Sequence, residues 1–359
     1  MTAKTPQPGD AKAVPIDLDK RKAFILATVV YEYVATAEPV GSHTLTQKYN
    51  LGVSSATIRN EMAELEAGGY LVQPHTSAGR IPSDAGYRTY VDRLMQPEPL
   101  PAREKSRIQD EFRAASRELD EVIEQTTRLL GQLSRSVAFV VAPQRDLQTL
   151  RHVQLIWLAE RSGLAIVVTS LGVATQTPFE HENLTSEDLT RLSNQLNAAF
   201  AGKTMRQIDP ADVLRAVRES SLPTTLGAMI VSAIATASRS DEPPAVFSSG
   251  AQHLLDQPEF QDLRKLRSIL RVIEEQKALY DLVADSMTGV APVIKIGHEL
   301  GSDDITECSV VTVPYRFGDE SVGVLAILGP RRMPYARLLA LASSTAESLN
   351  DHLANTEIR

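Results

Sequence analysis

Cysteine is nearly absent from this sequence, since Cys308 is the single one in 359 residues. That count excludes an intramolecular disulfide and any site built from several thiolates, and it is typical of a protein in the reducing cytosol. Long apolar runs are missing too, because the best candidate, 226–237, contains Gly, Ser and Thr and falls short of the ~20 residues of a membrane helix. The first 18 residues contain three prolines and no apolar signal segment. We therefore expect a disordered tail over 1–18 and a cytoplasmic protein without membrane contact.

An excess of positive charge is also lacking. The 37 Lys and Arg residues face 45 Asp and Glu residues, which gives a formal net charge of −8. This is the wrong sign for a protein that coats nucleic acid nonspecifically, so any DNA binding must be local. Ordinary glycine and proline contents exclude a collagen or a low-complexity chain, and 43% hydrophobic residues can fill two or three domains of ~100–200 residues each.

Helical periodicity begins at Asp19. Apolar residues recur at i, i+3, i+4 and i+7 in Leu26, Val29, Val30 and Tyr33, which predicts an amphipathic helix. The turn at 38–42 then introduces a short second helix that we expect to be capped by Ser42 and to end near Tyr49.

The segment 53–66 is the most informative part of the chain. Ser54 is suited to cap a helix whose inner face carries Ile58, Met62 and Leu65. At about 100° per residue, the opposite face carries small and polar side chains: Ala56, Arg59, Asn60 and Ala63.

This face has the chemistry of a DNA-reading helix. The two alanines allow close approach to a groove, Asn60 can pair bidentately with adenine, and Arg59 can reach guanine or phosphate. Ser54, Ser55 and Thr57 lie at the positive end of the helix, where phosphate binds well. The alternative to a DNA-binding helix is a helical bundle without a DNA-binding role. The region 19–93 allows it, because its eight basic and eight acidic side chains make it neutral overall.

A two-stranded wing is predicted over 68–82, with His75 in it and Arg80 at or beside its tip. Ser83 is expected to cap a further helix that carries Arg88. We therefore predict a winged helix-turn-helix whose DNA contacts include Ser54, Ser55, Ala56, Thr57, Arg59, Asn60, His75, Arg80 and Arg88.

These stretches resemble the HrcA family, the bacterial heat-inducible transcription repressors. The resemblance is carried by EPVGS at 38–42, VSSATIRNEMAELE at 53–66, QPHTSAGRIP at 73–82 and GYR at 86–88. It recurs downstream in FSSG at 247–250, IGHE at 296–299 and LGPRRMPY at 328–335. The pairs Ser248-Ser249 and His298-Glu299 depart from the family pattern, and both lie outside the DNA-reading part.

The resemblance implies a homodimeric repressor that binds the inverted-repeat operator CIRCE ahead of chaperone operons, supported by the chaperonin GroEL, and nucleoid-associated when bound. It also implies an α+β multidomain fold, in which a winged helix precedes a GAF-like α/β domain interrupted by an inserted dimerisation domain. The boundaries expected are 19–96 for the winged helix, 97–134 for a linker and long helix, 135–185 plus 286–359 for the GAF-like domain, and 186–285 for the insertion.

The downstream pattern supports such an interruption by itself. Strands are predicted at 136–142, 151–159, 164–169, 293–296, 309–317 and 322–328, with helices at 186–200, 212–219, 261–282 and beyond 334. The loop 160–163 predicts a hairpin, and Trp157 is expected in a core. The long amphipathic helix over 108–133 either pairs with its copy or packs on its own domain.

Catalytic patterns are missing. The seven histidines are scattered, and neither a zinc-protease helix, a nucleophile elbow nor a P-loop is present. We expect no enzyme, no catalytic residue, no metal and no cofactor. Two alternatives remain: a metabolite-responsive winged-helix repressor with a ligand in the GAF-like domain, and an assembly scaffold whose winged helix binds protein.

Overall fold

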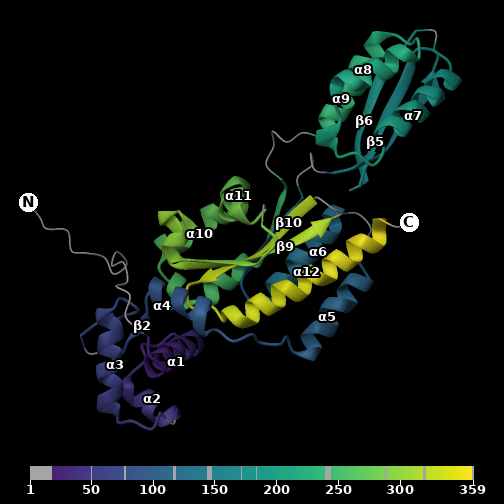
Figure 1. Cartoon of the computed structure of the whole chain (residues 1–359). Helices are drawn as coiled ribbons and strands as arrows, with labels where there is room; N and C mark the ends of the chain where they lie inside the picture. The colour runs from purple at the N-terminus through teal and green to yellow at the C-terminus, as the bar shows by residue number, and fades with distance from the viewer. Residues whose placement is uncertain are drawn as a thin grey trace, which may run out of the picture.

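Three structural units make up the chain, and a computed structural model shows how they are arranged (Figure 1). The structure describes residues 18–49, 51–76, 78–115, 119–143, 148–170, 172–182, 184–238, 244–287, 289–317 and 321–357. The predicted tail lies outside these residues except for Leu18, which packs against the first hydrophobic core. In the described part of the chain, no helix combines the length and the apolarity needed to cross a membrane.

The N-terminal unit (18–95) contains the predicted helices and a two-stranded antiparallel sheet. Its elements are α1 (Lys20–Thr36), α2 (Ser42–Lys48), α3 (Ser55–Ala67), β1 (Leu71–Val72), β2 (Ile81–Pro82), α4 (Asp84–Thr89) and a π-helix (Tyr90–Leu94). Ser54 and Ser83 cap α3 and α4 as predicted, by accepting hydrogen bonds from the backbone N–H of Thr57 and Gly86. Ser42 does not cap α2, because Gly41 occupies the N-cap position and Ser42 is already helical.

The sheet unit (102–143 and 246–357) is built on a five-stranded antiparallel sheet of order β7-β3-β10-β9-β8. Its strands are β3 (Val137–Val141), β7 (Val246–Ser249), β8 (Val293–Ile296), β9 (Cys308–Phe317) and β10 (Ser321–Pro330). Successive residues of β3 point to opposite faces, so Ala138 and Val140 join one core while Val137 and Phe139 join the other. Both faces of the sheet are therefore covered.

Helices cover the two faces in separate groups. The helices α5 (Ala102–Arg113), α6 (Leu119–Ser134) and α12 (Tyr335–Glu357) lie on one face, and α10 (Leu263–Glu274) and α11 (Gln276–Val283) lie on the other (Figure 1). The single long helix predicted over 108–133 is therefore two helices. Their apolar residues, such as Phe112 and Leu130, are buried in the chain's own core, which is the second of the two packings considered.

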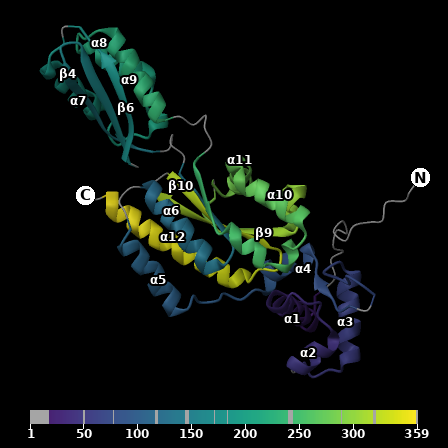
Figure 2. The ribbon, with the colours of Figure 1, turned by 180° about the vertical axis from the view of Figure 1, so that it is seen from behind.

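The insertion unit (148–238) stands apart from the rest in both views (Figures 1 and 2). It consists of β4 (Leu150–Ala159), β5 (Ser162–Thr169), β6 (Gly172–Glu180), α7 (Ser186–Phe200), α8 (Pro210–Glu219) and α9 (Thr224–Ala237). Among the residues that the structure describes, these strands pair only with one another, in the order β4-β5-β6, and the helices cover one face of that sheet.

The structure differs here from the boundaries expected from sequence. The hairpin of β4 and β5 is present, but it belongs to the insertion, while α10 and α11 belong to the sheet unit. The loop between β4 and β5 is also shorter than expected, because β5 begins at Ser162. Trp157 is not a core residue: its side chain lies near the end of the edge strand β4 and is 39% exposed.

Candidate nucleic-acid interface

The α3 face, defined as Ala56, Arg59, Asn60 and Ala63, is exposed along its whole length. The opposite side of the helix is buried, with Ile58 and Leu65 inaccessible to solvent. The helix is therefore anchored by an apolar stripe and presents small and polar side chains outward, as its periodicity predicted.

The acidic residues of α3 are paired with basic side chains of other elements. Glu61 is buried, and Arg21 of α1 approaches its Oε1 to 2.7 Å through Nη2. Lys22 Nζ lies 2.9 Å from Glu64 Oε2. Both carboxylates are thus neutralised by α1, whereas no ion pair is formed by Arg59 among the described residues.

Helix α2 is fixed to α1 by a second carboxylate. Lys48 Nζ and Tyr49 Oη donate to Glu32 at 2.6 and 2.7 Å. The hydrogen bonds from Lys48 and Tyr49 hold the pKa of the Glu32 carboxyl below its ordinary range and outweigh the opposing effect of burial. Glu32 therefore stays ionised near neutral pH and ties the end of α2 to α1.

The start of α3 gathers three hydroxyl groups. Ser54 Oγ accepts from Thr57 N at 3.2 Å and lies 3.1 Å from Thr57 Oγ1. Ser55 Oγ lies 3.0 Å from Ser42 Oγ, which links α2 to α3. A helix start with hydroxyl groups around it is suited to bind a phosphate oxygen.

The loop between β1 and β2 carries His75 at an exposed position. Gln73 braces this loop, because its side-chain amide donates to the carbonyl oxygens of Thr76 and Ala78 at 2.9 and 3.0 Å. The sequence did not single out Gln73, although a polar residue at the end of a strand before a turn is a signal of such bracing.

Arg80 does not lie at the loop tip. Its backbone pairs with Val40, and its Nη2 is 2.8 Å from Glu66 Oε2 of α3. The neighbouring Gly79 approaches Val40 so closely that a Cβ there would lie 2.4 Å from the Val40 carbonyl oxygen. The guanidinium of Arg80 thus links the residue just before β2 to α3.

Arg88 is also drawn away from the α3 face. Its Nε donates to Glu299 Oε1 at 2.9 Å, its Nη1 lies 3.1 Å from Asp92 Oδ1, and its Nη2 donates to the Ile294 carbonyl at 2.5 Å. Glu299 and Ile294 belong to the sheet unit. The structure therefore places Arg88 at the seam, the contact between the N-terminal unit and the sheet unit.

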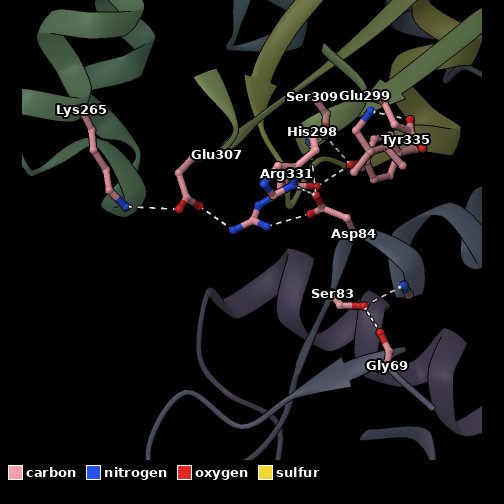
Figure 3. A network of polar contacts seen from close by, with 12 residues as sticks. Gly69, Ser83, Asp84, Lys265, His298, Glu299, Glu307, Ser309, Arg331 and Tyr335 are labelled. Atoms are coloured by element: carbon pink, nitrogen blue, oxygen red, sulfur yellow. Dashed lines mark hydrogen bonds and ion pairs between the residues drawn. The ribbon is translucent and has the colours of Figure 1, made fainter. Parts of the chain in front are cut away.

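The seam contains a polar network that the sequence did not reveal (Figure 3). Asp84, the first residue of α4, accepts from Arg331 Nη1 at 2.7 Å and lies 2.7 Å from His298 Nδ1. Arg331 Nη2 donates to Glu307 at 2.6 Å. The sequence did contain a signal for this network. The stretches IGHE and LGPRRMPY carry charged residues and belong to the family resemblance, yet they lie outside the DNA-reading helix and had no assigned role.

Two observations bear on metal binding and on the reactivity of the single thiol. The described residues contain no group of three or more His, Cys, Asp or Glu side chains that could hold a metal ion. Burial raises the pKa of the Cys308 thiol to about 12, so the thiolate that a nucleophile requires does not form near neutral pH.

Comparison with known proteins gives a consistent result. A family model described as "HrcA protein C terminal domain" matches residues 120–339. The chain is 38% identical over 337 residues to a protein of Pelotomaculum thermopropionicum named "Heat-inducible transcription repressor HrcA", covering 94% of this chain and 97% of that protein. A protein of Desulforudis audaxviator with the same name is 39% identical over 335 residues, covering 93% and 97%.

A solved structure is similar in fold. A crystal structure titled as a hypothetical protein at 2.2 Å resolution matches 95% of this chain and 100% of that chain, with a TM-score of 0.60 and 24% identity. At that identity the likeness concerns the fold alone.

Proposed function

The chain belongs to the HrcA family of heat-inducible transcription repressors, and on that premise we propose that it represses chaperone operons by binding the inverted-repeat operator CIRCE as a homodimer. The observation that carries the proposal is the α3 face, an exposed strip of alanine, asparagine and arginine whose neighbouring carboxylates are paired elsewhere. The protein acts in the cytoplasm and joins the nucleoid when it is bound to its operator.

In this proposal, the N-terminal unit is a winged helix-turn-helix and α3 enters the major groove. Asn60 pairs with an adenine edge, Arg59 reaches guanine or phosphate, and Ala56 and Ala63 let the helix sit close to the bases. Phosphate oxygens are held by the start of α3, with Ser54, Ser55 and Thr57, and by His75 in the wing loop.

Arg80 and Arg88 take a different part in this proposal from the one that the sequence suggested. Both guanidinium groups already hold carboxylates of the protein, Glu66 in the case of Arg80 and Glu299 in the case of Arg88. A phosphate contact would require these pairs to break, so we assign the two arginines to the framework of the DNA-binding unit.

The insertion unit offers a surface for the homodimer. One face of its sheet is covered by helices, and the other carries partly exposed apolar side chains, among them Ile156, Leu164 and Ile166. Leu158 at the edge is 55% exposed. A second copy is the occupant we propose, because a two-fold dimer presents two α3 faces to the two halves of an inverted repeat.

The sheet unit is the GAF-like domain of this proposal, and the heat response works through folding. The DNA-competent dimer is marginally stable, and GroEL keeps enough of it folded to occupy the operator. Proteins unfolded by heat compete for the chaperonin, so the active repressor falls and the operons are released.

The test is a binding titration on inverted-repeat DNA and on the same bases in scrambled order, at the growth temperature and at heat-shock temperature, with and without chaperonin. We expect tight binding of the inverted repeat only, loss of active protein on heating, and recovery with chaperonin. Equal binding of both duplexes would refute sequence reading. Full affinity after heating, unchanged by chaperonin, would refute the folding mechanism alone.

A metabolite-responsive repressor is the second candidate, favoured by a cavity of about 460 Å³ beside the seam. The cavity lies between α1 and the start of α12, with Tyr31, Arg135 and Arg337 in its wall. A ligand there would touch both units, and it would have to shift operator affinity by its own differential binding. Candidate metabolites added to the same titration distinguish the two functions.

A further inference from the structure

The seam is held by charged groups at several separate points. Asp84 binds Arg331 and His298, and Arg331 reaches on to Glu307, whose other oxygen lies 3.4 Å from Lys265 Nζ of α10 (Figure 3). One carboxylate of the N-terminal unit is thereby connected, through the guanidinium of Arg331, to residues that flank β9 and β10 and to α10.

Two further contacts join the same two units. Arg88 of α4 pairs with Glu299, whose Oε2 also accepts from the backbone N–H of Ile296 at 2.9 Å, so this carboxylate is held in place from both sides. From the sheet unit, Arg332 Nη1 donates to the carbonyl of Val34 in α1 at 3.3 Å. Because the contacts reach both α1 and α4, they restrict rotation of the N-terminal unit as well as its separation.

The backbone at Gly297 also allows the close approach of Asp84 to the sheet unit. Gly297 begins a short 3-10 turn (Gly297–Leu300) with φ +55, in the left-handed region. A Cβ at this position would lie 2.2 Å from Asp84 Oδ2. The backbone N–H of His298 also donates to that oxygen, at 3.3 Å. Glycine is therefore required here for the close approach of the Asp84 carboxylate.

The apolar contacts of the seam bury surface but do little to fix the relative orientation of the two units. Tyr87 and Tyr335 meet edge to face with ring centroids 6.0 Å apart, and both are almost fully buried. The hydroxyl of Tyr87 is buried without a hydrogen-bond partner among the described residues. Apolar contact is not directional, whereas paired guanidinium and carboxylate groups fix an orientation.

We propose that Asp84 and Arg331 are positioning residues for operator recognition: their ion pair fixes the N-terminal unit on the sheet unit, so that the two α3 faces of a dimer are presented at one separation. This proposal rests on the proposed function. Neither residue touches DNA. They act by making the protein selective for the spacing between the two halves of the operator.

The test varies the spacer of the inverted repeat by one base pair at a time and compares wild type with Arg331→Gln. We expect the wild type to prefer one spacer by about tenfold over its neighbours and the variant to lose most of that preference, while both bind a single half-site equally. The matched control is Arg264→Gln on α10, because Arg264 is 93% exposed and lies outside the seam. Arg331→Lys should retain only part of the spacer preference. Its ammonium group keeps the positive charge but cannot bind Asp84 and Glu307 at the same time with the geometry of a guanidinium.

Gly297→Ala perturbs the same contact without removing a charge. Its added methyl group would displace the Asp84 carboxylate, so we expect the same flattened spacer preference. The unfolding midpoint of each variant is measured as well. Spacer preferences are compared only at temperatures at which the variant is fully folded.

A readout without DNA separates this proposal from the proposed function. Spin labels at Ala67→Cys in α3 and Lys277→Cys in α11, with the buried Cys308 replaced by Ala, report the orientation of the N-terminal unit. We expect one narrow distance distribution in this labelled protein and a broad one when Arg331→Gln is added. An equally narrow distribution, or an unchanged spacer preference, would overturn the proposal. Failure of the wild type to bind any inverted repeat would overturn the operator function instead, and the distance distribution would still decide whether Arg331 fixes the orientation.

Discussion

Arg21 and Glu61 lie forty residues apart in the sequence, yet Arg21 Nε donates to Glu61 Oε1 at 2.8 Å. This contact joins the first helix of the N-terminal unit to α3, on the side opposite the α3 face. The exposed asparagine and arginine are therefore presented by a helix whose orientation depends on a buried carboxylate.

Replacing that carboxylate by an amide should lower stability. We expect Glu61→Gln to reduce the free energy of unfolding by roughly 1–3 kcal/mol, because the buried carboxylate of Glu61 loses its charge-assisted hydrogen bond from Arg21. Glu64→Gln is the control, since its 60% exposed carboxylate should contribute less than about 1 kcal/mol. Urea titrations measure both, and equal shifts would show that burial of Glu61 has no special effect.

Base reading by Asn60 can be measured on DNA. Asn60→Ala should weaken binding to the operator by roughly 1–3 kcal/mol and relax discrimination at one base pair, with little change on random duplex. Gln276→Ala, at an exposed position of α11, should alter neither affinity. If operator and random DNA lose the same affinity with Asn60→Ala, the residue does not read a base.

Gly86 is required by close packing within the N-terminal unit. A Cβ there would lie 2.1 Å from the Tyr70 carbonyl oxygen, so Gly86→Ala must move either α4 or the residue just before β1. We expect a loss of roughly 1–3 kcal/mol in unfolding free energy. Gly289→Ala meets its nearest atom at 3.8 Å and should change stability by less than about 0.5 kcal/mol. Thermal unfolding distinguishes the two, and a stable Gly86→Ala protein would contradict the observed packing.

The seam should weaken in acid. Burial opposes ionisation of Asp84, but hydrogen bonds from Arg331 and His298 outweigh it, so its pKa lies below the ordinary range. A lowered pKa in the folded state adds stability above the unfolded-state pKa, and this contribution is lost as the pH falls through the folded value, below about 4.

Asp84→Asn removes that contribution at all pH values. The stability difference between wild type and Asp84→Asn should therefore be constant above about pH 5 and shrink below about pH 4. Unfolding titrations from pH 7 to pH 3 measure it. A difference that grows in acid would have the wrong sign for a depressed carboxyl pKa.

The open sheet face of the insertion unit should control assembly. Ile166→Asp places a charge among the partly exposed apolar residues and is expected to convert a dimer into monomers, whereas Asn194→Asp on the exposed side of α7 should not. Sedimentation velocity measures the change. A dimer that persists in Ile166→Asp would place the contact between copies on another surface.

The local features were accessible from sequence because they depend on neighbouring residues. Helical periodicity placed the α3 face outward, and the serine caps at 54 and 83 follow from residue type. Pairing between distant strands is not encoded in this way. The loop before β5 indicated that β5 pairs with β4, but nothing in the apolar run of β3 indicates that it pairs with β10 and β7. The separation of 247 residues between Asp84 and Arg331 hid the seam for the same reason.

The roles of the arginines show the limit of reading composition alone. Arg59, Arg80 and Arg88 have the same side chain, yet Arg59 is exposed while the other two hold Glu66 and Glu299. Their difference comes from which carboxylate the fold brings near, and sequence gives that only where the partner is one or two turns away on the same helix.

The chain leaves the five-stranded sheet after β3 and returns at β7, and these two strands are antiparallel neighbours with Val141 directly opposite Val246. A two-residue turn could join them there, so the insertion unit interrupts what would otherwise be a β-hairpin. Substitutions or changes of length within the insertion unit could therefore accumulate while the five-stranded sheet and the exposed α3 face kept their shapes.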